Sequence, residues 1–277
     1  MVGLVLALNR VLPRPRVGGR ASPRAYWEWE RATGEALVAS HLGPSGDLAG
    51  RAVLDVGCGL GGKSVAYGVA GARSIAGIDL AIDNAHACQR FAADGDARAS
   101  CRLDFVAADA ARLPFADASF DTVVANDVME HLAEPAASLG EMARVTRPGG
   151  AVWLFFTPYY SPLGSHLYDY IRAPWCNLLL DRRRMEVAIR RVVTQRLPGD
   201  PEAIEREVTR VMDFYDHGLN RMSIRRFQRL VAAESRLAIT RHEHRPPRFQ
   251  ALRPLASLPF LCELLTGQAI FRLERRG

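Results

Sequence analysis

Over residues 51–157, short apolar runs alternate with longer segments in which apolar residues recur every three or four positions. Short β-branched and apolar runs predict strands, and the longer spacing predicts helices. The predicted strands are 52–56, 74–80, 102–109, 120–127 and 151–156, and the predicted helices are 63–70, 82–93 and 135–145. The turn Arg147-Pro148-Gly149-Gly150 precedes the fifth strand. Regular strand–helix alternation predicts a doubly wound parallel α/β sheet.

The alternation stops after Thr157 and resumes at Ser223, a predicted helix N-cap. The intervening segment is rich in Tyr, Trp, Arg and His, and it includes a predicted helix over 201–215. We interpret it as an insertion that covers the carboxyl edge of the sheet. Two further strands are predicted at 237–244 and 269–276, a helix at 26–41, and a short helix or arm at Val2–Leu8. The predicted divisions are an N-terminal arm and helix at 1–49, a core at 50–157, the insertion at 158–222 and completion of the sheet at 223–277.

The composition is that of a globular protein, with 277 residues, 48% hydrophobic and 24% charged. No apolar run approaches the ~20 residues of a membrane-spanning helix. The five cysteines lack CxxC spacing, which argues against a disulfide framework and a zinc site; no metal is expected. Val2–Leu8 lacks the basic n-region and the small-residue cleavage site of a signal peptide. These features favour a reducing cytoplasm.

Charge is distributed unevenly, with a net −2 over residues 1–150 and +8 over 151–277. Lys63 is the sole lysine, and we interpret the arginine excess as the mark of a GC-rich genome. The basic half could still attract an acidic substrate, a nucleic acid or an anionic membrane surface.

A glycine-rich turn between the first strand and the next helix predicts ligand binding, because glycines let the backbone approach a ligand and a helix N-terminus attracts anions. Gly57, Gly59 and Gly62 fit the dinucleotide pattern GxGxxG, with Asp79 at the matching distance. The same segment, from Gly57 through Lys63 to the next serine, also fits the phosphate-binding pattern GxxxxGKS, with Asp127 as a second acid.

Asp55 separates these alternatives, because it lies two positions before Gly57. A carboxylate there would repel a triphosphate or pyrophosphate in a partly desolvated cleft. It favours a ligand that carries a cation beside its anion, as a methionine moiety does. Asn126 also interrupts the strand before Asp127, and Lys63 is interpreted as a solvated residue at the start of a helix.

Four motifs occur in order: VLDVGCGLGG, IAGIDL, DFVAADAARLPFADASFDTVVANDVMEHL, and RPGG before an apolar strand. With them the chain resembles a class I S-adenosylmethionine-dependent methyltransferase. TPYYSPLGSHLYDYIRAPW and LNRMSIRRF are similar to segments of the branch that modifies small molecules. The resemblance implies a Rossmann-like, doubly wound seven-stranded sheet with an N-terminal helical arm and a helical insertion after the fifth strand. It also implies S-adenosylmethionine as cofactor.

Carried over by position, the resemblance implies that Gly57, Cys58 and Gly59 cradle the methionine moiety. Asp55 would hold its ammonium group, directly or through water. Asp79 would accept hydrogen bonds from both ribose hydroxyls, since a carboxylate has two acceptor oxygens. A helix N-cap is the alternative role for Asp79.

The resemblance implies that Asp109 accepts from the adenine amino group, with an Asx turn as the alternative. Asn126 would supply a backbone contact near the sulfonium. The remaining implied cofactor residues are Tyr26, Trp27, Leu80 and Ala110.

Methyl transfer from a sulfonium is an in-line displacement that needs alignment more than strong acid–base groups. A general base is optional, and His131 and His166 are the candidates. For His131, a capping role is the alternative. The insertion predicts an aromatic acceptor pocket, whose candidate residues are Tyr159, Tyr160, Tyr168 and His217.

The sequence thus predicts a cytoplasmic methyltransferase acting on O, N or C of a small aromatic or lipophilic molecule. One alternative is a membrane-associated lipid, quinone or sterol acceptor with peripheral membrane contact, because residues 255–265 are apolar and flanked by arginines. A non-catalytic cofactor-binding protein is another. Nucleic acid is a disfavoured partner, because no motif for it is present.

Overall fold

The computed structural model describes residues 1–13, 22–81, 83–84, 86–88, 91, 101–246, 258 and 261–277. The chain divides into two compact units. Unit 1 comprises Met1–Arg16, Phe156–Phe227 and Glu243–Ala269, and unit 2 comprises Val17–Phe155, Gln228–His242 and Ile270–Gly277. Much of the predicted helix 82–93 and of the apolar stretch 255–265 lies outside the described residues.

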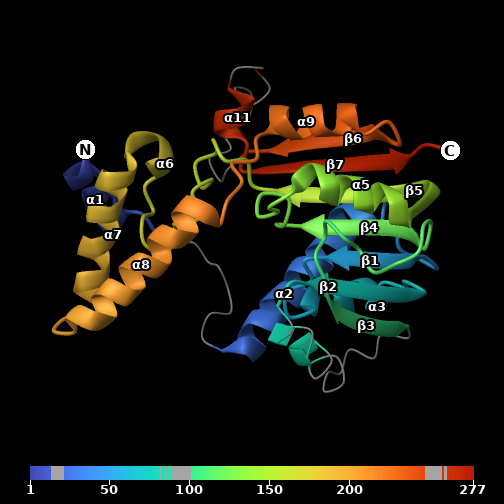
Figure 1. Cartoon of the computed structure of the whole chain (residues 1–277), viewed down its shortest axis with the longest axis horizontal. Coiled ribbons are helices and arrows are strands. Elements are labelled where there is room, and N and C mark those ends of the chain that lie inside the picture. Colours follow the sequence, from blue (N-terminus) through green and yellow to red (C-terminus); the bar gives the residue numbers. More distant parts are fainter. Residues whose placement is uncertain are drawn as a thin grey trace. The chain divides into compact units, whose positions relative to one another are not determined.

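A seven-stranded sheet has the order β3-β2-β1-β4-β5-β7-β6 (Figure 1). Its strands are β1 Ala52–Val56, β2 Ser74–Asp79, β3 Arg102–Ala107, β4 Phe120–Asn126, β5 Thr146–Phe156, β6 Leu237–Arg245 and β7 Gln268–Arg275. All seven were predicted from the sequence, and the α/β fold class is confirmed. The order reverses between β1 and β4, which places the ends of these two strands at the topological switch point where such folds bind ligands.

The strands from β3 through β5 are parallel, whereas β7 runs in the opposite direction (Figure 1). The Arg276 N–H donates to the Arg236 carbonyl at 2.8 Å and the Gly267 N–H to the Arg245 carbonyl at 2.7 Å, as in an antiparallel pair. The prediction of a wholly parallel sheet is therefore wrong at this edge. An antiparallel neighbour needs no crossover helix.

The helices of the core are α2 Pro23–Leu37, which continues into the π-helical turn Val38–Leu42, together with α3 Gly62–Val69, α5 Pro135–Val145 and α9 Ile224–Ala233. Helix α2 begins before the predicted residue 26, because the Ser22 hydroxyl accepts from the Ala25 N–H and Pro23 stands in the first turn. The predicted cap at Ser223 is confirmed, since its hydroxyl accepts from the Arg226 N–H at 3.1 Å.

Strand β5 begins at Thr146, so the sequence Arg147–Gly150 belongs to the strand and the turn predicted there is wrong. The pairing of β4 with β5 shifts register between Phe120 and Thr122. A bulge of this kind absorbs extra residues without ending the strand, and Gly149 takes a positive φ of 74° within it.

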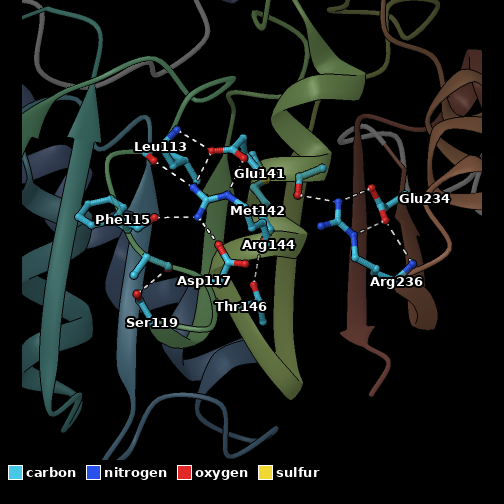
Figure 2. Close-up of polar contacts among 12 residues, drawn as sticks. Leu113, Phe115, Asp117, Ser119, Glu141, Met142, Arg144, Thr146, Glu234 and Arg236 are labelled. Carbon is cyan, nitrogen blue, oxygen red and sulfur yellow. Dashed lines mark hydrogen bonds and ion pairs between the residues drawn. The ribbon is translucent and has the colours of Figure 1, made fainter.

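Helix α5 is tied to the loop after β3 by Arg144, as Figure 2 shows. Its guanidinium donates to Glu141 at 2.7 and 2.8 Å, to Asp117 at 2.7 Å, and to the carbonyls of Phe115 and Leu113 at 2.8 and 3.1 Å. This loop carries the candidate adenine contacts, so the Arg144 contacts fix the backbone that follows them.

Unit 1 has its own core, formed by α1 Val2–Val11, α6 Cys176–Leu179, α7 Arg182–Arg196 and α8 Pro201–His217. The apolar start of the chain is a helix whose Val5 is buried. The Asn9 side chain accepts from the Arg172 N–H and donates to the Tyr170 carbonyl. None of the helices in the described part of the chain has the length and apolar character needed to cross a bilayer.

Candidate functional site

The loop that joins β1 to α3, residues 57–62, is called the glycine loop here. Gly57, Gly59 and Gly61 all have positive φ, between 58° and 83°. The Cys58 N–H donates to the Ile78 carbonyl at 2.9 Å, and the Gly59 N–H donates to Asp79 Oδ2 at 3.1 Å. The loop is therefore bound to the end of β2, which brings the first two predicted cofactor motifs together.

Glu30 of α2 closes the other side of the glycine loop. Its carboxylate accepts from the Leu60 N–H at 3.1 Å and from the Gly62 N–H at 3.3 Å, and its side chain is fully buried. A Cβ at Gly59 would collide with Glu30 Oε1, and one at Gly62 would collide with the Trp27 carbonyl. Burial raises the pKa of Glu30 to about 7, against the opposing effects of Lys63 and the Gly62 N–H.

The sequence did not identify Glu30, although a signal was present. The buried residues of α2 are Trp27, Glu30, Gly34 and Leu37, which share one helical face. A carboxylate on the apolar face of an amphipathic helix needs a partner. Here the partners are backbone N–H groups at the start of α3.

Lys63 is buried, with 6% of its surface exposed, so the interpretation as a solvated helix-start residue is wrong. Its Nζ lies 3.8 Å from Glu30 Oε1. Burial opposes the charge, but Glu30 and Asp55 outweigh it and raise the pKa of Lys63. The ammonium is thus committed to neighbouring carboxylates rather than to solvent.

Asp55, near the end of β1, is fully buried. Its Oδ2 accepts from the Ser64 hydroxyl at 2.6 Å, whereas its Oδ1 has no hydrogen-bond partner among the described residues. Burial raises the pKa of Asp55 to about 6, and Lys63 and Ser64 pull it in the opposite direction. A buried oxygen without a partner is costly, so this atom indicates where a ligand donor would bind.

These contacts decide which kind of ligand fits the glycine loop. The Leu60 and Gly62 N–H groups, which a phosphate would need, already donate to Glu30. Lys63 and Ser64, the last residues of the phosphate-binding pattern, face Glu30 and Asp55. The loop presents acceptors, and acceptors suit a ligand with an ammonium group and hydroxyls.

The two candidate carboxylates after β2 and β3 also make local contacts. Asp79 Oδ1 accepts from the Ala81 N–H at 3.0 Å and from Asn84 Nδ2 at 3.1 Å. Asp109 Oδ1 accepts from the Ala111 N–H at 2.9 Å, the Asx turn foreseen as its alternative role. Each carboxylate oxygen has more than one lone pair, so these bonds leave acceptor capacity for a ligand. Their roles toward ribose and adenine stay predictions.

The other implied cofactor residues lie at or after strand ends or on α2. Asn126 is the last residue of β4, and its buried Oδ1 has no hydrogen-bond partner in the described part of the chain. Trp27 is buried, with its ring 6.1 Å from that of Phe91, and Ala110 is buried as well. Leu80 is 77% exposed. Tyr26 is half-buried on α2, beside Trp27 in the chain.

The candidate base His131 belongs to unit 2, where its backbone N–H donates to the Val128 carbonyl at 2.8 Å. The other candidate base and the acceptor residues belong to unit 1. There the rings of Tyr159 and Tyr160 are 5.5 Å apart, and those of His166 and Tyr168 are 6.4 Å apart. His217 is exposed and pairs with Asp213 at 3.0 Å. Catalysis and acceptor binding by these residues stay predictions.

Comparison with known proteins places the central segment in a family. Residues 54–154 match the family model of a methyltransferase domain. Residues 54–154 of this chain therefore form a methyltransferase domain. The domain spans the glycine loop, Asp79, Asp109 and Asn126, so the resemblance stated from the sequence is confirmed.

Among curated relatives, an uncharacterized methyltransferase of Mycolicibacterium vanbaalenii is 39% identical over 138 residues, which are 50% of this chain and 47% of that protein. The matches cover about half the length of such relatives. Among solved structures, geranyl diphosphate C-methyltransferase from Streptomyces coelicolor has a TM-score of 0.56 at 18% identity, covering 91% of this chain and 81% of that one. The cyclase SpnF also has a TM-score of 0.56, at 17% identity, covering 99% of this chain and 92% of that one. These two likenesses show the fold.

Proposed function

We propose that the protein transfers a methyl group from S-adenosylmethionine to O, N or C of a small aromatic or lipophilic acceptor. The observation that supports the cofactor most strongly is the buried Asp55 Oδ1, which has no hydrogen-bond partner among the described residues. Asp55 lies in β1, just before a loop whose anion-binding N–H groups already serve Glu30. That arrangement rejects polyphosphate and favours an ammonium group.

When bound, the cofactor supplies an electrophilic methyl group on a positively charged sulfur. Asp55 binds the ammonium group of its methionine moiety, and Asp79 accepts from the ribose hydroxyls. Asp109 and the Ala110 N–H bind the adenine edge, and the backbone of Asn126 lies near the sulfonium. These residues hold the cofactor while the acceptor aligns with it, and alignment is the main requirement of an in-line displacement.

We assign acceptor binding to the aromatic residues of unit 1. Tyr159 and Tyr160 pack edge to face at 5.5 Å, and Tyr168 lies beside His166, so the segment supplies flat apolar surfaces suited to an aromatic or prenyl-like acceptor. The methyltransferase named for geranyl diphosphate shares the fold and supports a small lipophilic acceptor. His131 or His166 serves as base where the acceptor needs one. The proposed location is the cytoplasm.

The cyclase SpnF supports a second candidate, because it shows that the same fold is found in a protein named for a different reaction. In that case the chain binds the cofactor without methyl transfer. Membrane association, with a lipid, quinone or sterol acceptor, is the third candidate. It draws on the exposed Leu4 and Val11 of α1, with Arg10 between them.

Calorimetric titration with S-adenosylhomocysteine, S-adenosylmethionine, magnesium-ATP and NAD in parallel tests the cofactor. We expect micromolar binding of the first two ligands alone. Binding of ATP or NAD instead would contradict the charge argument at the glycine loop. An assay of methyl transfer to a panel of phenols, prenyl diphosphates and quinones then distinguishes an active methyltransferase from a protein that binds the cofactor without turnover. Co-sedimentation with anionic vesicles tests the membrane candidate.

A further inference from the structure

The Glu30 carboxylate makes the kind of contacts that a bound anionic ligand would make. It accepts from the N–H groups of Leu60, in the glycine loop, and of Gly62, the first residue of α3, and its Oε1 lies 3.8 Å from Lys63 Nζ. Helix N-termini bind anions with such N–H groups. Asp55, whose charge also acts on Lys63, presents the buried Oδ1 that has no hydrogen-bond partner among the described residues.

The amino acid end of the cofactor carries one ammonium group and one carboxylate. Its ammonium group suits Asp55, and its carboxylate needs the donors that Glu30 now occupies. We propose that Glu30 competes with the cofactor's own carboxylate for Lys63 and for the Leu60 and Gly62 N–H groups, so that Glu30 and Lys63 set the affinity for the amino acid end of the cofactor. This inference rests on the proposed function.

The choice of residue at position 63 supports this role. Lys63 is the sole lysine among 36 basic residues, in a chain that has arginine at every other basic position. An ammonium group is compact and forms no planar fork, so it fits between carboxylates that a guanidinium would spread apart. Exchange of one carboxylate partner for another leaves the charge of Lys63 paired throughout.

Close packing holds the backbones of α2 and α3 together during that exchange. Helix α2 touches α3 so closely that a Cβ at Gly34 would lie 2.8 Å from Lys63 Cα. Helix α2 is therefore held against α3 when another carboxylate approaches, so that Glu30 stays near it and repulsion favours the neutral form of Glu30. The charged or titratable groups that face Glu30 are Lys63 and Tyr67 of α3 and Asp55 of β1.

Calorimetry with two probes tests the proposal: S-adenosylhomocysteine, and 5′-methylthioadenosine, which lacks the amino acid end. At pH 8, where Glu30 is charged in the wild type, we expect E30Q to bind S-adenosylhomocysteine at least about fivefold more tightly. At pH 6 the two proteins should agree within about twofold. Comparing wild type with E30Q at each pH isolates the effect of the Glu30 charge, which includes its repulsion of Asp55.

The second variant is Lys63→Met, for which we expect at least about tenfold weaker binding of S-adenosylhomocysteine. Binding of 5′-methylthioadenosine should change by less than about twofold in both variants. E28Q, on the exposed face of the same helix and paired with Arg24, is the matched control and should bind both probes as the wild type does. Thermal unfolding of each variant confirms that it folds.

Weaker binding of S-adenosylhomocysteine by E30Q at pH 8 would overturn the proposal, since it would make Glu30 a direct contact for the ammonium group. Equal changes for both probes would also overturn it, because the effect would then lie in the shape of the loop. If the wild type binds neither probe, the proposed function fails and the inference fails with it. If it binds both while the variants do not discriminate, the inference alone fails.

Discussion

Individual carboxylates determine what the glycine loop accepts. The loop sequence satisfies two phosphate-binding patterns, yet its N–H groups serve Glu30 and Asp79 instead. Asp55 adds a third carboxylate, fully buried, behind the loop. Charge at these positions therefore overrides the glycine pattern, because a polyphosphate placed among three carboxylates would lose solvation and be repelled.

Asp79 is the residue through which the ribose prediction is tested. We expect Asp79→Ala to weaken the affinity for S-adenosylhomocysteine at least about tenfold, or about 1.4 kcal/mol, through loss of a charge-assisted contact to two hydroxyls. Calorimetric titration of both proteins provides the comparison.

Asp104→Ala is the control for that experiment, because Asp104 lies on the neighbouring strand β3, is half exposed and pairs with Arg102 at 2.6 Å. It should leave the affinity unchanged. Unchanged affinity in Asp79→Ala as well would mean that the ribose is held elsewhere. Asp79→Asn then separates the two roles of the side chain, since an amide retains the acceptor for the Gly59 N–H.

Sequence reasoning located Asp55, Asp79 and Asn126 because each ends or nearly ends a strand, and parallel strands bring their carboxyl ends to one edge. It missed Glu30 and misjudged Lys63. Both errors have one cause: the two residues are paired across 33 positions of the chain, and no local pattern reports such a contact. Only the place of Glu30 on the apolar face of α2 gave a sign of it.

At the scale of elements, the described strands were all predicted, because short apolar runs between helical segments leave few alternatives. The differences lie at boundaries. Ser22 and Pro23 start α2 early, and the strand β5 runs through a sequence typical of a turn. The direction of β7 was missed because hydrophobic spacing is the same in parallel and antiparallel strands.

Helix α5 supplies a prediction at this scale, through Arg144. The guanidinium bonds Glu141 of its own helix and, in the preceding loop, Asp117 and two carbonyls, while only 25% of the Arg144 side chain is exposed. Figure 2 also shows Arg236 joining Glu234 to the same helix, with Nη2 3.0 Å from the Gly140 carbonyl. We expect Arg144→Ala to lower the free energy of unfolding by about 1 to 3 kcal/mol, measured by urea denaturation.

The matched control is Arg206→Ala, since Arg206 is 70% exposed and its partner Glu202 is 88% exposed. Exposed pairs of this kind contribute little, so the change should stay within about 0.5 kcal/mol. A similar loss in both variants would show that the Arg144 contacts do not hold the loop to α5. Affinity for S-adenosylhomocysteine in Arg144→Ala reports whether the loop also positions Asp109.

At the scale of the whole molecule, the chain folds into two compact units from interleaved segments. Helix α1 joins the core of unit 1, whereas α2 belongs to unit 2, although both lie in the first 49 residues. Sequence alone cannot show this, because the contacts of Asn9 with Tyr170 and Arg172 span more than 160 positions. The predicted divisions at 50, 158 and 223 stay predictions.

Some buried carboxyl groups have raised pKa values and others have lowered ones, and together they predict how stability depends on pH. Burial raises the folded-state pKa of Glu30 to about 7 and of Asp55 to about 6, so both bind protons more tightly in the folded chain than in the unfolded one. Stability then falls as pH rises from about 4 toward 7 and is level above it. For Glu30 alone the loss is on the order of 3 kcal/mol.

A second group of carboxylates acts in the opposite direction at lower pH. Burial alone would raise the pKa of Asp47, but hydrogen bonds from Arg272 and Trp153 outweigh it and lower that pKa. The stability that Asp47 contributes is present above the unfolded pKa of about 4 and is lost as pH falls through its folded value. The two effects together place maximal stability at about pH 4, just below the range in which Glu30 and Asp55 begin to lose their protons.

Urea unfolding followed by tryptophan fluorescence at pH 5 and pH 8 tests this expectation, with the higher midpoint expected at pH 5. E30Q, which has no proton to lose at that position, should show a smaller difference between the two pH values, and E28Q should behave as the wild type does. A wild-type midpoint that rises steadily from pH 5 to pH 8 would mean that Glu30 and Asp55 are charged at low cost in the folded protein. The electrostatic basis for ligand choice at the glycine loop would then be lost as well, because that choice depends on carboxylates held where charge is expensive.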